Sequence, residues 1–299
     1  MAVGRIKIGV SGLLVVDKPR GITSRTAVDR VIRAAGRAKA GHAGTLDPLA
    51  SGVLVVCLGS ATRLVEEVQA QPKSYRTVVR LGARSDTLDA DGHIEEAIDP
   101  RPSTREDIEA AIQPMVGEVA QVPPEFSALK VGGRRAYDLA RAGQTVELAA
   151  RRVRIDRIEV IRYEWPHLEL EVDCGSGTYI RSIARDIGEA VGTGGLVEVL
   201  VRTRIGPFTL DSAVGLEDLT PETLAAAIRP TVEATTGLPR RSLDPNELAA
   251  IAAGRPIAAG PGCHAGPLAL INADGELVAI AEVIPDLQSI RPRKVLISQ

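Results

Sequence analysis

The 299-residue sequence predicts an α+β protein with a mixed, largely antiparallel central sheet, flanking helices and a small β-rich domain at its C-terminus. Strand-like and helix-like segments interleave without the strict alternation of a parallel sheet, and hairpin signals are present. Beyond about residue 230 the composition shifts. Because the length fits one large domain and one small one, we expect domains over residues 1–235 and 240–299.

Apolar or alternating runs predict the strands. The first run is stopped by Pro19, and the run that begins at Tyr75 is followed by the polar, turn-like residues 86–92. Two alternating runs in the middle of the chain indicate a hairpin, and Asn272 to Gly275 is a second hairpin signal. In chain order, the predicted strands cover residues 12–18, 53–58, 75–81, 153–163, 168–174, 267–271 and 277–281.

Helices are expected where a capping residue precedes apolar residues that recur on one face. Thr23 or Ser24 can cap the first helix, and Thr104 can cap another whose first turn is acidic. Residues 37–52 are rich in glycine and lack sustained periodicity, so we expect a loop there. In chain order, the predicted helices cover residues 24–35, 61–68, 104–115, 134–142, 179–191 and 244–253.

The composition argues against several classes of protein. No apolar run is long enough to span a membrane, and the first residues lack the apolar region of a signal peptide, so a cytoplasmic protein is expected. The three cysteines and four histidines are scattered and form no zinc-binding pattern.

The net charge of −2 hides a strong segregation of charge along the chain. Residues 1–40 carry nine basic and two acidic side chains, whereas residues 86–125 carry two basic and eleven acidic ones. Binding to nucleic acid needs a local basic surface rather than a basic protein. A nucleic-acid partner is therefore compatible with this composition.

The loop over residues 41–52, GHAGTLDPLASG, contains one carboxylate, Asp47. Pro48 restricts Asp47 to extended backbone geometry and removes a backbone donor. A carboxylate held in this way can act as a nucleophile. Asp-Pro is also a common start of a turn. The residues alone leave both interpretations open.

This loop resembles the catalytic loop of the TruB pseudouridine synthases at all of its positions. Three other segments resemble motifs of that family and occur in the same order: residues 12–24 (GLLVVDKPRGITS), 73–76 (KSYR) and 177–182 (GTYIRS). The resemblance covers roughly residues 12–210. It implies the pseudouridine synthase fold, with residues 1–235 as the catalytic domain. It also implies an enzyme that isomerises uridine 55 in the T-loop of tRNA.

The resemblance also implies roles for individual residues. Asp47 would be the catalytic carboxylate, Arg181 its ion-pair partner, and Tyr75 would pack against the target base. His42 would insert into the T-loop when the base is flipped. Lys18 would hold the first motif or a phosphate. Further residues expected to bind the substrate or the RNA are Tyr179, Leu200, Lys130, Arg134 and Arg141.

The chemistry is compatible with these roles. The isomerisation breaks the N1–C1′ bond of uridine, rotates the uracil and rejoins it through C5, so no redox change and no cofactor or metal are implied. Asp47 must be ionised, and a nearby arginine opposes the tendency of burial to protonate it. Flipping a base costs a few kcal/mol, and stacking on an aromatic ring such as Tyr75 returns about 1–3 kcal/mol.

Three further segments extend the resemblance. Residues 85–92 continue it and are expected to orient Arg181. The basic residues about 123–150, interleaved with Phe126 and Tyr137, resemble an insertion that closes over the tRNA stem, although an ordinary basic loop is the alternative. Residues 240–299 loosely resemble a small RNA-binding domain of the PUA type.

Two other functions stay open at this point. One is a tRNA-binding folding helper without catalytic activity. The other is a hydrolase with paired carboxylates, which would need a second acid where the motifs offer an arginine. The favoured hypothesis is a monomeric isomerase whose partner is the T-arm stem-loop of tRNA.

Overall fold

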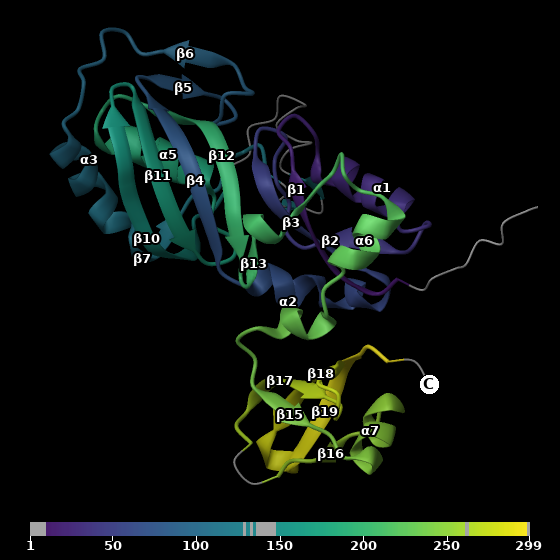
Figure 1. Cartoon of the computed structure of the whole chain (residues 1–299). Coiled ribbons are helices and arrows are strands. Elements are labelled where there is room, and N and C mark those ends of the chain that lie inside the picture. The colour runs from purple at the N-terminus through teal and green to yellow at the C-terminus, as the bar shows by residue number, and fades with distance from the viewer. Residues whose placement is uncertain (1–9, 128–129, 132–133, 136–147, 261–262, 298–299) are drawn as a thin grey trace, which may run out of the picture.

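The computed structural model describes residues 10–127, 130–131, 134–135, 148–260 and 263–297. These residues form a ten-stranded sheet and, below it in Figure 1, a five-stranded sheet. In this part of the chain no helix is both long enough and apolar enough to cross a membrane.

The large sheet is mixed and largely antiparallel, which confirms the predicted fold class. Its order is β14-β1-β3-β12-β4-β11-β10-β7, with β13 beside β12 and β2 beside β3. Among the described strands of this sheet, β1–β14 and β3–β12 are the parallel pairs. The strands are β1 (Gly12–Lys18), β2 (Ala40–His42), β3 (Ser51–Leu58), β4 (Lys73–Leu81), β7 (Gly117–Gln121), β10 (Arg151–Glu164), β11 (His167–Cys174), β12 (Gly195–Ile205), β13 (Phe208–Thr209) and β14 (Val214–Gly215).

The central strand β12 is absent from the sequence prediction. It runs parallel to β3 and antiparallel to β4, and so joins the N-terminal part of the sheet to the part built from β4, β11 and β10. Its burial does not alternate regularly, because two register shifts interrupt its pairing with β4. The expected loop over residues 37–52 is also wrong at β2 and at the first residues of β3, where main-chain pairing extends the sheet.

The helices begin at the capping residues that the sequence indicates. Thr23 caps α1 (Ser24–Ala34) by accepting a hydrogen bond from the Thr26 amide, and Thr104 and Asp107 form a capping box on α3 (Arg105–Ile112). Both α3 and α5 lie against one face of the large sheet (Figure 1). The other helices are α2 (Val65–Ala70), α5 (Ile180–Ala190), α6 (Pro221–Ala227) and α7 (Pro245–Ala252).

Two predicted helices differ from the structure. The segment over 61–68 is a 3₁₀ helix, η1 (Gly59–Leu64), followed by α2. The helix predicted over 134–142 is wrong at its start, because β9 (Arg134–Arg135) pairs with β8 (Lys130–Val131) as a strand. Residues 136–142 lie outside the described residues.

The five-stranded sheet has the order β15-β17-β18-β19-β16 and contains the predicted β17–β18 hairpin. One hydrophobic cluster joins the two sheets, since Leu13 and Phe208 belong to the same cluster as Ile280 and Leu296. The domain boundary near residues 235–240 therefore stays a prediction. The strands are β15 (Arg240–Ser242), β16 (Ile257–Ala258), β17 (Gly266–Ile271), β18 (Leu277–Ile284) and β19 (Ser289–Val295), and a separate pair outside both sheets is β5 (Ala83–Ser85) with β6 (Ile94–Glu96).

Candidate active site

The loop between β2 and β3 is held in place by its own apolar residues and by one serine. Leu46 and Leu49 are buried in the main core. The Ser24 hydroxyl donates to the Leu46 carbonyl (3.0 Å) and accepts from the Leu46 amide (2.8 Å). Asp47 lies between Leu46 and Leu49 in the chain, and its side chain is 42% exposed. The fold thus presents one carboxylate on a loop that is anchored in the core.

Arg181, in the first turn of α5, forms the ion pair that the sequence predicts. Its Nη2 lies 2.8 Å from Oδ2 of Asp47, and its Nη1 lies 3.3 Å from Oδ2 of Asp89. The arginine and Asp89 side chains are each only 6% exposed, so the contact between these two is largely shielded from water. One guanidinium therefore holds two carboxylates from separate loops.

Asp89 belongs to the turn over residues 85–92, which the sequence predicts to orient Arg181. Burial raises its pKa, and hydrogen bonding by the Thr87 hydroxyl (2.6 Å) and the charge of Arg181 act against that rise. Its turn is attached to β12 by hydrogen bonds between Ala90 and Val197 (2.9 Å) and between Val197 and Leu88 (3.0 Å). The expected contact between this turn and Arg181 is therefore present.

Hydrogen bonds also join the first turn of α5 to residues 121–126. Arg181 donates to the Phe126 carbonyl (3.0 Å), and Ser182 donates to the Val122 carbonyl (2.8 Å). The Gln121 side chain donates to the Tyr179 carbonyl (3.1 Å) and accepts from the Tyr179 amide (2.8 Å). These long-range contacts have no signal in the local sequence.

Tyr75 and Leu200 lie on neighbouring strands and face the same side of the sheet. The register pairs Thr77 with Leu200 and Tyr75 with Arg202, so these four side chains share one face. Tyr75 is 8% and Leu200 is 7% exposed. Tyr179 lies at the N-cap of α5 and is half-buried. Burial raises the pKa of both tyrosines, which therefore stay neutral at pH 7.

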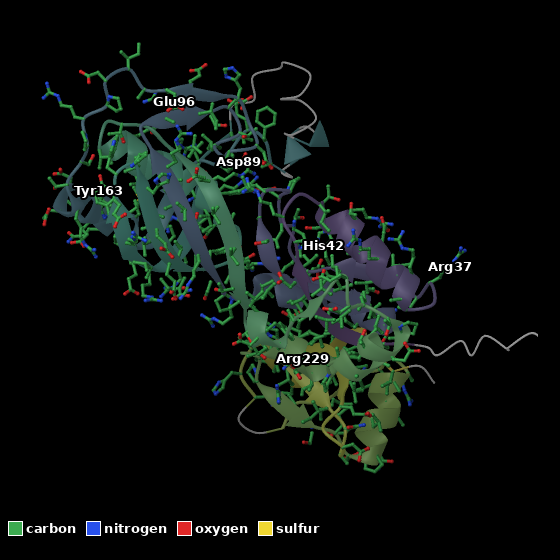
Figure 2. All side chains as sticks on the ribbon, turned by 45° about the horizontal axis from the view of Figure 1, so that its top comes forward. Arg37, His42, Asp89, Glu96, Tyr163 and Arg229 are labelled. Atoms are coloured by element: carbon green, nitrogen blue, oxygen red, sulfur yellow. The ribbon has the colours of Figure 1, made fainter. Side chains whose placement is uncertain are left out.

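His42 is half-buried on β2, and its Nδ1 has no hydrogen-bond partner among the described residues. Burial lowers its pKa, and the charges of Arg202 and Arg25 lower it further, so the ring is neutral at pH 7. Figure 2 shows His42 on the side of the N-terminal strands and Asp89 on the side of β12. The two residues thus come from different parts of the fold.

The expected contact between Lys18 and an RNA phosphate needs correction. The side chain is fully buried, and Nζ donates to the carbonyls of Pro19 (3.0 Å) and Ile22 (2.7 Å). Burial lowers its pKa to about 8. Lys18 therefore holds the turn after β1, which was the other role considered for it, and a phosphate cannot reach it in this conformation.

The remaining expected RNA-binding residues belong to the insertion. Lys130 and Arg134 lie on β8 and β9, but their side chains, like the whole of Arg141, fall outside the described part of the structure. Within the described ranges, no group of three or more His, Cys, Asp or Glu side chains is placed to hold a metal ion.

Comparison with known proteins shows the family. The model of the TruB family pseudouridylate synthase (N terminal domain) matches residues 32–180, and that of the tRNA pseudouridylate synthase B C-terminal domain matches residues 181–249. Proteins named tRNA pseudouridine synthase B from Mycobacteroides abscessus and Mycobacterium tuberculosis are each 44% identical over 90% of this chain and 91% of their own length.

Solved structures agree with this result. A Cbf5-Nop10-Gar1 complex contains a chain with a TM-score of 0.77 and 26% identity, covering 96% of this chain and 85% of that one. An H/ACA RNP bound to a substrate RNA containing 2′-deoxyuridine gives a TM-score of 0.74 at 27% identity, with the same coverage of both chains. The fold, the arginine-paired aspartate and these matches together define a pseudouridine synthase. The chain belongs to the TruB family.

Proposed function

We propose that this protein converts uridine 55 in the T-loop of tRNA to pseudouridine, with Asp47 as the catalytic carboxylate and with the target base flipped out of its stack. The observation that carries the proposal is the 2.8 Å contact between Asp47 and the buried Arg181, on a loop that Leu46 and Leu49 anchor in the core. The name of the relatives that are 44% identical supports tRNA as the substrate.

Arg181 has a clear electrostatic purpose in this proposal. Asp47 acts as a nucleophile or assists elimination at the sugar, and both actions need an ionised carboxylate. A flipped nucleotide above Asp47 would exclude water, and the adjacent guanidinium balances the charge of the carboxylate there. The reaction breaks N1–C1′, forms C5–C1′, releases the proton from C5 and protonates N1. No electrons are gained or lost.

The flipped uracil would rest against Tyr75 and Leu200, with Tyr179 at its edge. A few kcal/mol are needed to extract the base, and about 1–3 kcal/mol return from stacking on an aromatic ring. His42 suits insertion into the emptied place in the T-loop, because its neutral ring can stack on a base. It has no assigned proton-transfer step.

The RNA backbone would contact exposed basic residues of the N-terminal region. Arg25, Arg33, Arg37 and Lys39 are exposed on α1 and the turn after it, and Figure 2 shows Arg37 pointing away from the protein. Such side chains bind phosphates without selecting a sequence. Lys130, Arg134 and Arg141 of the insertion are proposed to contact the T-stem in the same way.

The test compares the wild-type protein with Asp47→Asn on a T-arm stem-loop that carries tritium at C5 of the target uridine. We expect the wild type to release tritium and the variant to bind the RNA without releasing it. Asp286→Asn, at an exposed position of η5 (Pro285–Leu287), is the matched control and should release tritium normally. A wild type that binds the RNA but releases no tritium would support the folding-helper hypothesis instead.

A further inference from the structure

Arg202 is a buried cation for which the reaction outlined above has no use. It lies on β12, its exposure is 2%, and it is among the largest fully buried side chains of the described residues. Its main chain stands between two parts of the site, since residue 202 pairs with Gly52 of β3 on one side and with Tyr75 of β4 on the other.

The Arg202 guanidinium reaches back to the loop that carries Asp47. Its Nη2 donates to the Gly44 carbonyl (3.0 Å), its Nη1 reaches the Thr45 carbonyl (3.5 Å), and its Nε donates to the Val53 carbonyl (2.8 Å). These acceptors stand before and after Asp47 in the chain. One side chain thus ties the two ends of the catalytic loop together.

One glycine allows this close approach, and a second gives the loop its backbone conformation. Gly52 has a φ of +99°, and a Cβ added there would lie 2.3 Å from the Arg202 carbonyl oxygen. Gly44 has a φ of +104°, a conformation that other residues adopt with strain, and its Cβ would lie 3.5 Å from Nη1 of Arg202. The backbone conformation of the Asp47 loop and the position of Arg202 therefore depend on each other.

The same guanidinium lies beside the Tyr75 hydroxyl. A buried charge is costly unless it is hydrogen-bonded, and here main-chain carbonyls of the loop and of β3 satisfy it. Removing the guanidinium would leave these carbonyls without their donor. It would also free the catalytic loop and the ring of Tyr75 to move independently.

We propose that Arg202 is a positioning residue for pseudouridine formation: it fixes the Asp47 loop and the Tyr75 ring in one geometry without touching the substrate. This inference rests on the proposed function, in which Asp47 is catalytic. A misplacement of about 1 Å can lower a rate roughly 100-fold, so the effect on the chemical step should be large.

Arg204 offers a matched control on the same strand. A register shift between Arg202 and Arg204 places the two side chains on opposite faces of the sheet. Arg204 is 41% exposed and contacts Asp173 (3.4 Å) and the Ser74 hydroxyl (3.1 Å) on the face away from the site. Arg204→Met therefore removes a similar charge from β12 without touching the loop.

The experiment measures three quantities for Arg202→Met, Arg204→Met and the wild type: the single-turnover rate at saturating stem-loop RNA, the RNA affinity, and amide hydrogen exchange over residues 41–52. We expect Arg202→Met to lose about 100-fold in rate, to keep its affinity within about threefold, and to exchange faster in this segment alone. Arg204→Met should match the wild type. Arg202→Lys, which keeps the charge but not the planar fork, should recover part of the rate.

Leu268→Ala is the control for a general loss of stability. It opens a cavity in the core of the five-stranded sheet and leaves the Asp47 loop unchanged, so it shows what destabilisation alone does to the rate. If this variant loses rate as Arg202→Met does, or if Arg202→Met keeps a rate within about threefold of the wild type, the inference is overturned. Should the methionine variant not fold, Arg202→Lys carries the same comparison. Asp47→Asn is measured in parallel: if it is active, the proposed function fails, whereas an inactive Asp47→Asn beside a normal Arg202→Met removes the inference alone.

Discussion

Two networks of arginine and carboxylate groups lie on opposite faces of the large sheet. On the face covered by α5, Arg181 binds Asp47 and Asp89 with 6% of its side chain exposed. On the other face, Arg157 lies 2.9 Å from Glu171 and 3.0 Å from Asp173, and its side chain is 45% exposed. The chemical groups are the same, and their access to water differs.

The carboxylates respond to this difference in opposite directions. Burial raises the pKa of Asp89, and its hydrogen bonds do not overcome this effect. Burial also acts to raise the pKa of Asp173, but hydrogen bonds from Ser74 and Arg157 outweigh it, so the pKa is lowered. Water and salt screen an exposed ion pair, and water can hydrate either group if its partner is removed. In a shielded site, a charge that loses its partner stays buried and uncompensated. The burial of Arg181 and Asp89, rather than the pairing itself, distinguishes this network from that of Arg157.

The largest expected effect comes from Arg181→Met. It leaves Asp89 as a buried carboxylate without its cation, which should cost about 3–5 kcal/mol in the free energy of unfolding. It also removes the cation that contacts Asp47 at 2.8 Å, so the rate of tritium release should fall at least about 100-fold. Urea unfolding and single-turnover kinetics measure the two effects.

Arg181→Lys is the control for this prediction. A lysine keeps the charge but cannot reach both carboxylates with a planar fork. We expect it to restore more of the stability than of the rate. Full activity in Arg181→Met would contradict the view that the buried network serves catalysis.

A smaller effect should appear in the dependence of stability on pH. Burial lowers the pKa of Lys18 from 10.5 to about 8, so between these values the unfolded chain holds a proton that the folded protein has released. The stability contributed by Lys18 therefore rises as the pH rises through this window. Lys18→Met should lack this rise. The melting temperature of the wild type minus that of the variant should therefore increase between pH 8 and pH 10. A difference in melting temperature that stays constant over this pH range would contradict the prediction.

The smallest effect is expected from Arg157→Ala on the open face. Its partners Glu171 and Asp173 are partly exposed and keep contacts with Arg76 (3.8 Å) and Arg204 (3.4 Å) when it is removed. The melting temperature and the rate of tritium release should match those of the wild type within the precision of each measurement. A loss as large as that of Arg181→Met would show that burial does not distinguish the two networks.

Local sequence patterns predict a large part of this fold. Apolar runs predict β1, β3 and β4, alternating runs predict β10 and β11, and Thr23 and Thr104 occupy the caps expected of them. These features depend on neighbours a few residues apart, which is why a single sequence contains them. The motifs likewise lead to Asp47, Tyr75 and Arg181, and the structure brings Asp47 and Arg181 into contact.

The pairing of distant segments is decided by the tertiary structure alone. β12 inserts between β3 and β4, and no local pattern states which strands will be its neighbours. A period of two would place Arg202 and Arg204 on the same face, but the register shift on β12 separates them. Lys18 likewise has the sequence of a candidate RNA ligand, yet it is fully buried. The sequence by itself determined the chemical groups of the site and most of its strands and helices. The sheet order and the burial it creates decided which charges meet, because both depend on contacts between residues far apart in the chain.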